Sequence, residues 1–219
     1  MTNIITYLAA FFWIMAISPF LAEASVDGQA DKSARGRSII SYSVSNNSLL
    51  VLKGTTNMNS FECFSAAADS RGYILADASL SENKVGFTGA DILVKVESFD
   101  CKNAFITRDM HNALGSSTNP GIEIKLLDAI IGDTDWYSQQ GSVMANILIT
   151  LNGRSKTKEL VIDWQRYGFE YSFEGSAELS MTEFDIDPPS PALGIVKVND
   201  NITVSFNYNV KSDYVSRLD

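Results

Sequence analysis

The chain has 219 residues, 45% of them hydrophobic and 20% charged, which fits one globular domain or at most two small ones and excludes a disordered tail or a fibrous repeat. Its net charge of -9 would repel nucleic-acid phosphates and anionic lipid headgroups, so we expect no nucleic-acid partner. One His and two Cys are too few for a zinc finger, a two-His metal site or an iron-sulfur cluster, and we expect neither a metal nor a cofactor.

The first segment of the chain predicts export. Residues 4–21 are nearly all apolar, and Pro19 and a small-x-small triplet ending at Ala24 terminate the run. This pattern is typical of a secretory signal peptide, here residues 1–24, and we expect a protein exported from the cytoplasm without a stable membrane anchor after cleavage. Because no Lys or Arg precedes the apolar run, an uncleaved anchor is the alternative. Residues 25–38 are polar without periodicity, which predicts a flexible leader.

Beyond the leader, apolar and polar residues alternate with period two, which predicts strands with one buried face. The clearest strand covers residues 202–210, and the others are expected at 48–53, 61–66, 92–97, 122–126, 143–151, 158–164 and 169–174. The pair Asn152-Gly153 favours a tight hairpin between two of them. About eight strands in a domain over residues 39–212, with a tail at 213–219, indicate an all-β barrel or sandwich.

A single short helix is expected between Cys101 and Gly115. Apolar residues recur there at helical spacing, Asn103 is suited to cap the start, and Gly115 is suited to the left-handed position after the end. In a barrel, such a helix would close one end.

The apolar faces of the expected strands would point into a closed barrel. An eight-stranded barrel is wide enough either to be filled by these side chains or to hold one small ligand, and periodicity does not separate the two cases. The residues are Ile92, Val94, Val96, Ile122, Ile124, Leu126, Ile147, Ile149, Phe169, Tyr171, Phe173, Val204, Phe206 and Tyr208.

The two cysteines, Cys63 and Cys101, predict a disulfide, because an exported chain meets an oxidising compartment and only one intramolecular pairing exists. Two free thiols are the alternative.

His111 lies near Arg108 and Asp109, which invites a catalytic interpretation. We favour a structural His, since Asp109 is two positions away and therefore on a different helical face. No catalytic residue is predicted.

Four segments, taken in order, resemble the YceI-like family. Residues 52–63, with Gly54 and Phe61, resemble its opening strand, turn and second strand; residues 94–111, with Arg108-Asp109, resemble its strand and Arg-Asp helical segment. Residues 119–124 resemble a later strand entry, and residues 149–156 resemble its Gly-containing hairpin. The similarity spans about residues 48–210. Where many members carry Asn-Arg-x-Asp-Phe-Gly, this chain departs with residues 181–185, so headgroup contacts are not carried over.

The resemblance implies an eight-stranded antiparallel lipocalin-like barrel with one short helix capping an end. It implies a periplasmic protein that sequesters or carries a polyisoprenoid or other lipid-like amphiphile without chemistry, and it makes the fourteen inward residues ligand-lining. The Cys63 and Cys101 pair resembles that of a cysteine-containing subgroup. One alternative is an envelope interaction module with a packed barrel and no ligand, and another is an enzyme using His111, Arg108 or loop carboxylates. The oligomeric state is unknown from the sequence.

Overall fold

The computed structural model describes residues 35–66, 70–79, 83–130 and 138–218. The predicted signal peptide and most of the predicted leader lie outside these residues. The strands are β1 (Arg35–Val44), β2 (Leu49–Thr56), β3 (Ser60–Ala66), β4 (Arg71–Ser79), β5 (Lys84–Thr88), β6 (Asp91–Lys95), β7 (Gly121–Ile130), β8 (Gln140–Leu151), β9 (Arg154–Tyr167), β10 (Glu170–Ser180) and β11 (Val198–Leu218). The helix is α2 (Ala104–Ala113), and short 3-10 turns are η2 (Val96–Ser98), η3 (Met181–Phe184) and η4 (Ala192–Gly194).

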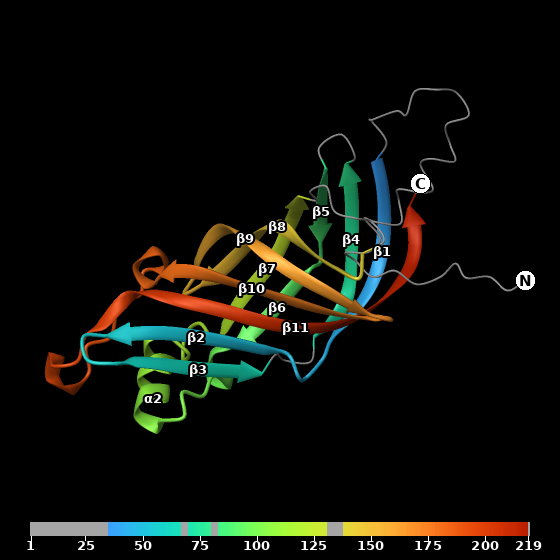
Figure 1. The fold of residues 1–219 in the computed structure, drawn as a ribbon. Helices are drawn as coiled ribbons and strands as arrows, with labels where there is room; N and C mark the ends of the chain where they lie inside the picture. The colour runs from blue at the N-terminus through green and yellow to red at the C-terminus, as the bar shows by residue number, and fades with distance from the viewer. Residues whose placement is uncertain (1–34, 67–69, 80–82, 131–137, 219) are drawn as a thin grey trace, which may run out of the picture.

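Eight antiparallel strands close into a ring in the order β1-β4-β5-β7-β8-β9-β10-β11, with β11 returning to β1. Strand β11 makes this closure because it is 21 residues long: residues 201–211 pair with β10, and residues 210–218 pair with β1. Figure 1 shows the ring with α2 below β3 at one end and β1, β4 and β5 at the other. The predicted eight-stranded antiparallel barrel is confirmed.

Three further strands extend the wall toward α2. Strand β2 pairs with residues 198–207 of β11, β3 pairs with β2, and β6 pairs with the start of β7. Strand β3 and the chain after β6 then meet at a single bridge between Phe64 and Asp100, where Cys63 and Cys101 form the predicted disulfide. The wall at the α2 end is therefore closed by a covalent bond rather than by a full strand ladder.

The domain is longer at both ends than the sequence predicted. Strand β1 begins at Arg35, inside the predicted leader, and β11 continues to Leu218, through the predicted tail. The strand pattern of β1 is weak because Ser38 is buried on the same side as Ile40, so a small polar residue occupies an inward position. Strand β4 was missed for a similar reason, since Ala76 and Ala78 occupy its buried positions.

The expected hairpin and the expected helix are both present. Asn152 and Gly153 adopt φ angles of 51° and 72° between paired Leu151 and Arg154, as a two-residue type I′ turn requires. Asn103 Oδ1 accepts hydrogen bonds from the amides at the start of α2, and Gly115 lies just past its end with φ 67°. No helix within the described ranges combines the length and apolar character needed to cross a bilayer.

Two large buried clusters occupy the barrel, and a third, smaller one consists of Val44 and Tyr208. One large cluster draws on β1, β4, β5, β7, β8, β9 and β10 and includes Ile40 and Trp164. The other lies at the α2 end and includes Phe99 and Phe184. The partly buried side chains of Ile147 and Phe206 pack against both large clusters. The space enclosed between these clusters is the candidate site.

Candidate functional site

An outer chamber of about 490 Å³ lies beneath α2. Its walls come from α2, β2, β7, β8, β10, β11 and the segment around η3 and η4. Ile106, Met110 and Ala113 on one face of α2 line it, at the spacing that places them together on a helix. Helix α2 therefore covers this end of the barrel, as the sequence predicted.

An inner chamber of about 180 Å³ lies farther from α2. It adjoins the outer chamber, because five residues line both: Leu50, Ile124, Ile149, Leu179 and Val204. Tyr42, Tyr208 and Ser212 line only the inner chamber. The volumes of the two chambers taken together fall in the range of small-molecule sites in proteins, about 300 to 1,000 Å³.

Most of the lining is apolar. Among the described residues, the charged lining groups are Asp109 in the outer chamber and Asp91 in the inner one, and neither chamber has a lining Lys or Arg. Such a surface binds by removing apolar ligand area from water and offers no cation for a phosphate.

The outer chamber opens beside the β2–β3 turn. Met58 in that turn and Phe105 on α2 both line the chamber while 69% and 70% exposed. Asn57 ties this turn to the η4 segment, donating from Nδ2 to the Ile195 carbonyl and accepting from the Lys197 amide at 2.8 Å. Two loops distant in sequence therefore meet beside this opening, and Pro191 and Val196 of the η4 segment also line the chamber.

The turn η3 forms part of the wall of the outer chamber. Met181 and Phe184 are buried and line the chamber. Asp200 accepts hydrogen bonds from the Ser180 hydroxyl and from the Thr182 amide and hydroxyl, which lower the pKa of its carboxyl. The hydrogen bond from Lys158, 2.7 Å from Glu183, lowers the pKa of Glu183. These contacts hold η3 in place.

Ten of the fourteen predicted lining residues border at least one chamber. They are Ile92, Ile122, Ile124, Leu126, Ile147, Ile149, Phe173, Val204, Phe206 and Tyr208. Their contact with a ligand stays a prediction.

Four predicted lining residues lie elsewhere. Val94 and Val96 are buried in the core cluster at the α2 end, and Val96 belongs to η2, where the strand alternation has stopped. Tyr171 is packed in the other cluster. Phe169 lies in the β9–β10 turn, one residue before β10 begins, and 43% of its surface is exposed. The apolar alternation in the sequence extends to Phe169, but the strand that would turn this side chain inward does not.

Sequence reasoning missed the lining residues of α2, η3 and the segment before β11. Leu50 and Leu52 lie in a predicted strand and share its apolar parity, so they were available to the same argument. The residues at 181–198 follow no period of two or 3.6, and only the closed barrel brings them to the chamber.

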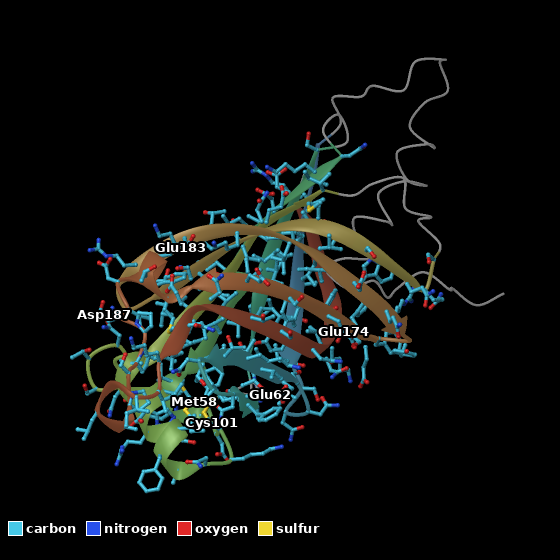
Figure 2. All side chains as sticks on the ribbon, turned by 60° about the vertical axis from the view of Figure 1, so that its left-hand side comes forward. Met58, Glu62, Cys101, Glu174, Glu183 and Asp187 are labelled. Carbon is cyan, nitrogen blue, oxygen red and sulfur yellow. A yellow bond between two sulfur atoms is a disulfide. The ribbon has the colours of Figure 1, made fainter. Side chains whose placement is uncertain are left out.

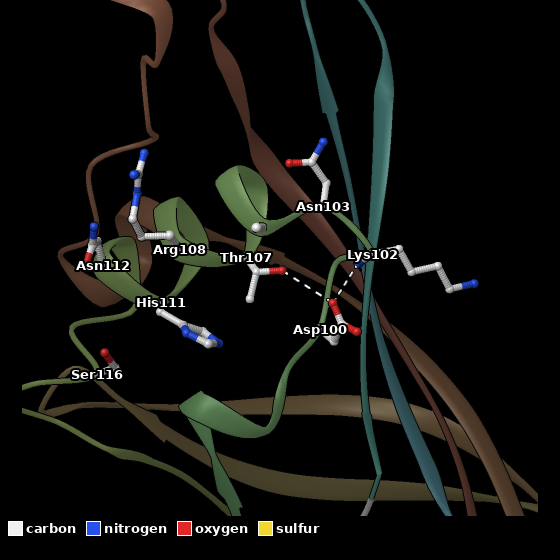
Figure 3. Close-up of a pocket in the computed structure, with 9 residues that line it drawn as sticks. Asp100, Lys102, Asn103, Thr107, Arg108, His111, Asn112 and Ser116 are labelled. Carbon is white, nitrogen blue, oxygen red and sulfur yellow. Dashed lines mark hydrogen bonds between the residues drawn. The ribbon is translucent and has the colours of Figure 1, made fainter.

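The residues of the enzymatic alternative lie outside the chambers. Figure 3 shows His111, Arg108 and Asp100 around a polar depression on the outer side of α2. His111 Nε2 is 3.0 Å from the Phe99 carbonyl oxygen, which only accepts, so this nitrogen donates. Asp109 lines the outer chamber instead, on the other side of the helix. The described residues contain no group of three or more side chains suited to hold a metal ion.

Comparison with known proteins supports the fold. No protein-family model and no curated protein sequence matches the chain. A polyisoprenoid binding domain from Saccharophagus degradans, implicated in plant cell wall breakdown, matches with a TM-score of 0.57 and 9% identity, over 78% of this chain and 97% of that one. BcnA of Burkholderia cenocepacia matches with a TM-score of 0.56 and 11% identity, over 74% and 95%. The chain has the YceI-like fold.

The match covers nearly the whole of both solved neighbours. One of these neighbours is described as binding a polyisoprenoid. At 9% and 11% identity the likeness concerns the fold, and the chemistry of this barrel rests on its own lining.

Proposed function

We propose that this protein binds and carries a polyisoprenoid or a related lipid-like amphiphile inside the barrel. The observation that carries the proposal is the pair of adjoining, mostly apolar chambers of about 490 and 180 Å³ inside the barrel. A barrel filled by its own side chains, as the interaction-module alternative requires, would leave no such space. The polyisoprenoid-binding description of one fold neighbour supports the same class of ligand.

Binding would result from burial. Each methylene moved from water into an apolar site contributes about 0.8 kcal/mol, so affinity would increase with chain length until the chambers are filled. The barrel contributes shape and exclusion of water, and the proposal includes no chemical step.

The rim around Met58 and Phe105 would be the entry path. Both side chains are exposed and line the outer chamber, so an apolar chain entering there would stay in contact with apolar surface. We place this activity in the periplasm or outside the cell, on the strength of the apolar segment at residues 4–21 and the disulfide. Cell fractionation with N-terminal sequencing tests this location, and the mature chain is expected to begin at Ser25.

The experiment for the binding proposal is native mass spectrometry combined with solvent extraction of protein purified from its own cell envelope. We expect a bound lipid in the parent protein and its loss in Val204→Trp, because Val204 lines both chambers and a larger side chain would fill space in them. Val161→Trp is the matched control, since Val161 is half exposed on the outside of β9. An empty parent protein that also takes up no added lipid would contradict the proposal.

A further inference from the structure

Two buried hydroxyl groups in the inner chamber have no hydrogen-bond partner among the described residues. Tyr208 is 6% exposed and Ser212 is 5% exposed, and both line this chamber. Neither Tyr208 Oη nor Ser212 Oγ makes a hydrogen bond within the part of the chain that the structure describes. A buried hydroxyl left unpaired costs about 1 to 3 kcal/mol, so most buried polar groups in proteins are paired.

Strand geometry directs both groups to the same side. Tyr208 and Ser212 lie four residues apart on β11, and an even separation places two side chains on one face of a strand. Tyr208 pairs in register with Phe173 of β10, and Ser212 pairs with Tyr42 of β1. Both partners also line the inner chamber.

The third phenol of this chamber behaves differently. Tyr42 Oη donates to the Asp91 carbonyl oxygen at 3.0 Å, so its hydrogen-bonding capacity is used within the protein. Burial raises the pKa of Tyr208 to about 12, and its hydroxyl therefore keeps its proton at neutral pH and stays a donor. Within the described residues, the inner chamber thus offers two donors without a partner in a largely apolar enclosure.

The charge of the lining restricts what these donors can bind. Among the described residues, Asp91 is the charged residue that lines the inner chamber, and no Lys or Arg lines it. A buried phosphate without a cationic partner is strongly disfavoured, whereas a neutral oxygen needs only a donor.

We infer that the inner chamber holds the polar end of the ligand, that this end is an uncharged oxygen-bearing group such as an alcohol or a carbonyl, and that Tyr208 and Ser212 donate hydrogen bonds to it. The apolar tail then lies in the outer chamber and points toward the rim at Met58 and Phe105. This inference rests on the proposed function and adds to it the orientation and the headgroup class.

The test uses two probes that differ only at the polar end, geranylgeraniol and geranylgeranyl phosphate. The parent protein should bind the alcohol at least tenfold more tightly than the phosphate. Tyr208→Phe or Ser212→Ala should weaken binding of the alcohol about three- to tenfold, the range expected for loss of one neutral hydrogen bond. Ser38→Ala is the matched control, because Ser38 Oγ is also buried and unpaired but lines neither chamber.

A second measurement separates a binding role from a structural one. In the ligand-free protein, Tyr208→Phe should leave Tm unchanged or raise it, because the substitution removes an unsatisfied buried hydroxyl. A purely structural hydroxyl would lower Tm and leave affinity unchanged. If both variants bind geranylgeraniol like the parent, or if the phosphate binds as tightly as the alcohol, the assignment fails while the carrier proposal stands. If the parent binds neither probe, the assignment fails together with the proposed function.

Discussion

Cys63 of β3 is bonded to Cys101 at the place where Phe64 and Asp100 exchange two backbone hydrogen bonds of 2.9 and 2.8 Å. Figure 2 shows Cys101 and the disulfide beside α2. The bond therefore connects the outermost added strand to the segment that begins the helical cover, and it closes the one part of the wall where the ladder is reduced to a single bridge.

Removing this disulfide is expected to loosen the covered end of the barrel. The bond closes a loop of 38 residue steps, and chain-entropy reasoning assigns such a loop about 3 to 4 kcal/mol of stability. The double variant Cys63→Ala and Cys101→Ala should lose about that much free energy of unfolding and should release bound lipid faster. Thiol labelling of exported protein under denaturing, non-reducing conditions should find no free cysteine. Two labelled cysteines per chain would show that the bond does not form.

A second prediction compares the chamber wall with the packed core. Ile149 lines both chambers, whereas Ile40 is fully buried and lines neither. Ile40→Ala should cost about 2 to 5 kcal/mol by creating a void, and Ile149→Ala should cost less, since space already adjoins that side chain. Phe206→Ala should likewise stay below the 3 to 5 kcal/mol typical of a packed Phe while changing the preferred lipid length.

Chemical denaturation of delipidated protein measures these differences. Core-sized losses in both Ile149→Ala and Phe206→Ala, together with an empty solvent extract from the parent, would refute the carrier proposal.

The regular parts of this fold could be predicted from the sequence because a few neighbouring residues determine the conformation of each. The alternation in β11 and the Asn152-Gly153 turn each specify a conformation within a few residues, and so do the Asn103 cap and Gly115 at the ends of α2. Strands such as β4 were not predictable by the same means, because inward Ala76 and Ala78 carry little apolar signal.

The same distinction applies to the candidate site: local sequence patterns predict some of its residues and not others. Residues such as Ile149 and Phe206 could be placed inside by parity, but the unpaired state of Tyr208 could not, since it depends on which groups from other strands face its hydroxyl. The lining role of Met181 and Phe184 also depends on ring closure, because the turn η3 has no periodicity of its own.

A third prediction concerns Gly175, which lies opposite Phe206 in the β10–β11 ladder. A Cβ at this position would lie 2.7 Å from Phe206 Cζ, so Gly175→Ala should displace the Phe206 ring, cost about 1 to 3 kcal/mol and reduce lipid uptake. Gly86→Ala is the control, as its added Cβ would meet its nearest neighbour at 3.9 Å. Combining Gly175→Ala with Phe206→Leu should restore uptake. Unchanged uptake in Gly175→Ala alone would mean that the ring position does not limit the inner chamber.

The last prediction concerns Asp200, whose carboxylate accepts hydrogen bonds from η3 in the wall of the outer chamber. Hydrogen bonds from the Ser180 hydroxyl and the Thr182 amide hold its pKa below the ordinary value of 3.8. A carboxyl with a lowered pKa in the folded state contributes stability above its unfolded pKa, and this contribution is lost as the pH falls below about 4 through the folded value. Asp200→Asn removes the charge while keeping an acceptor, and we expect a loss of about 1 kcal/mol at neutral pH, a figure kept small because the group is partly solvated.

Unfolding by urea at pH values from 7 down to 3 measures this effect as the difference between the parent and Asp200→Asn. This difference in the free energy of unfolding should stay constant from pH 7 to about 5 and then shrink toward pH 3. The reason is that the carboxyl of the unfolded chain is protonated there more readily than the folded one, whose pKa is lowered. Asp187→Asn provides a matched control, since Asp187 is exposed, follows η3 by three residues and makes no hydrogen bond or ion pair among the described residues. A difference in the free energy of unfolding between the parent and Asp200→Asn that does not change with pH would show that the charge of Asp200 does not hold the turn.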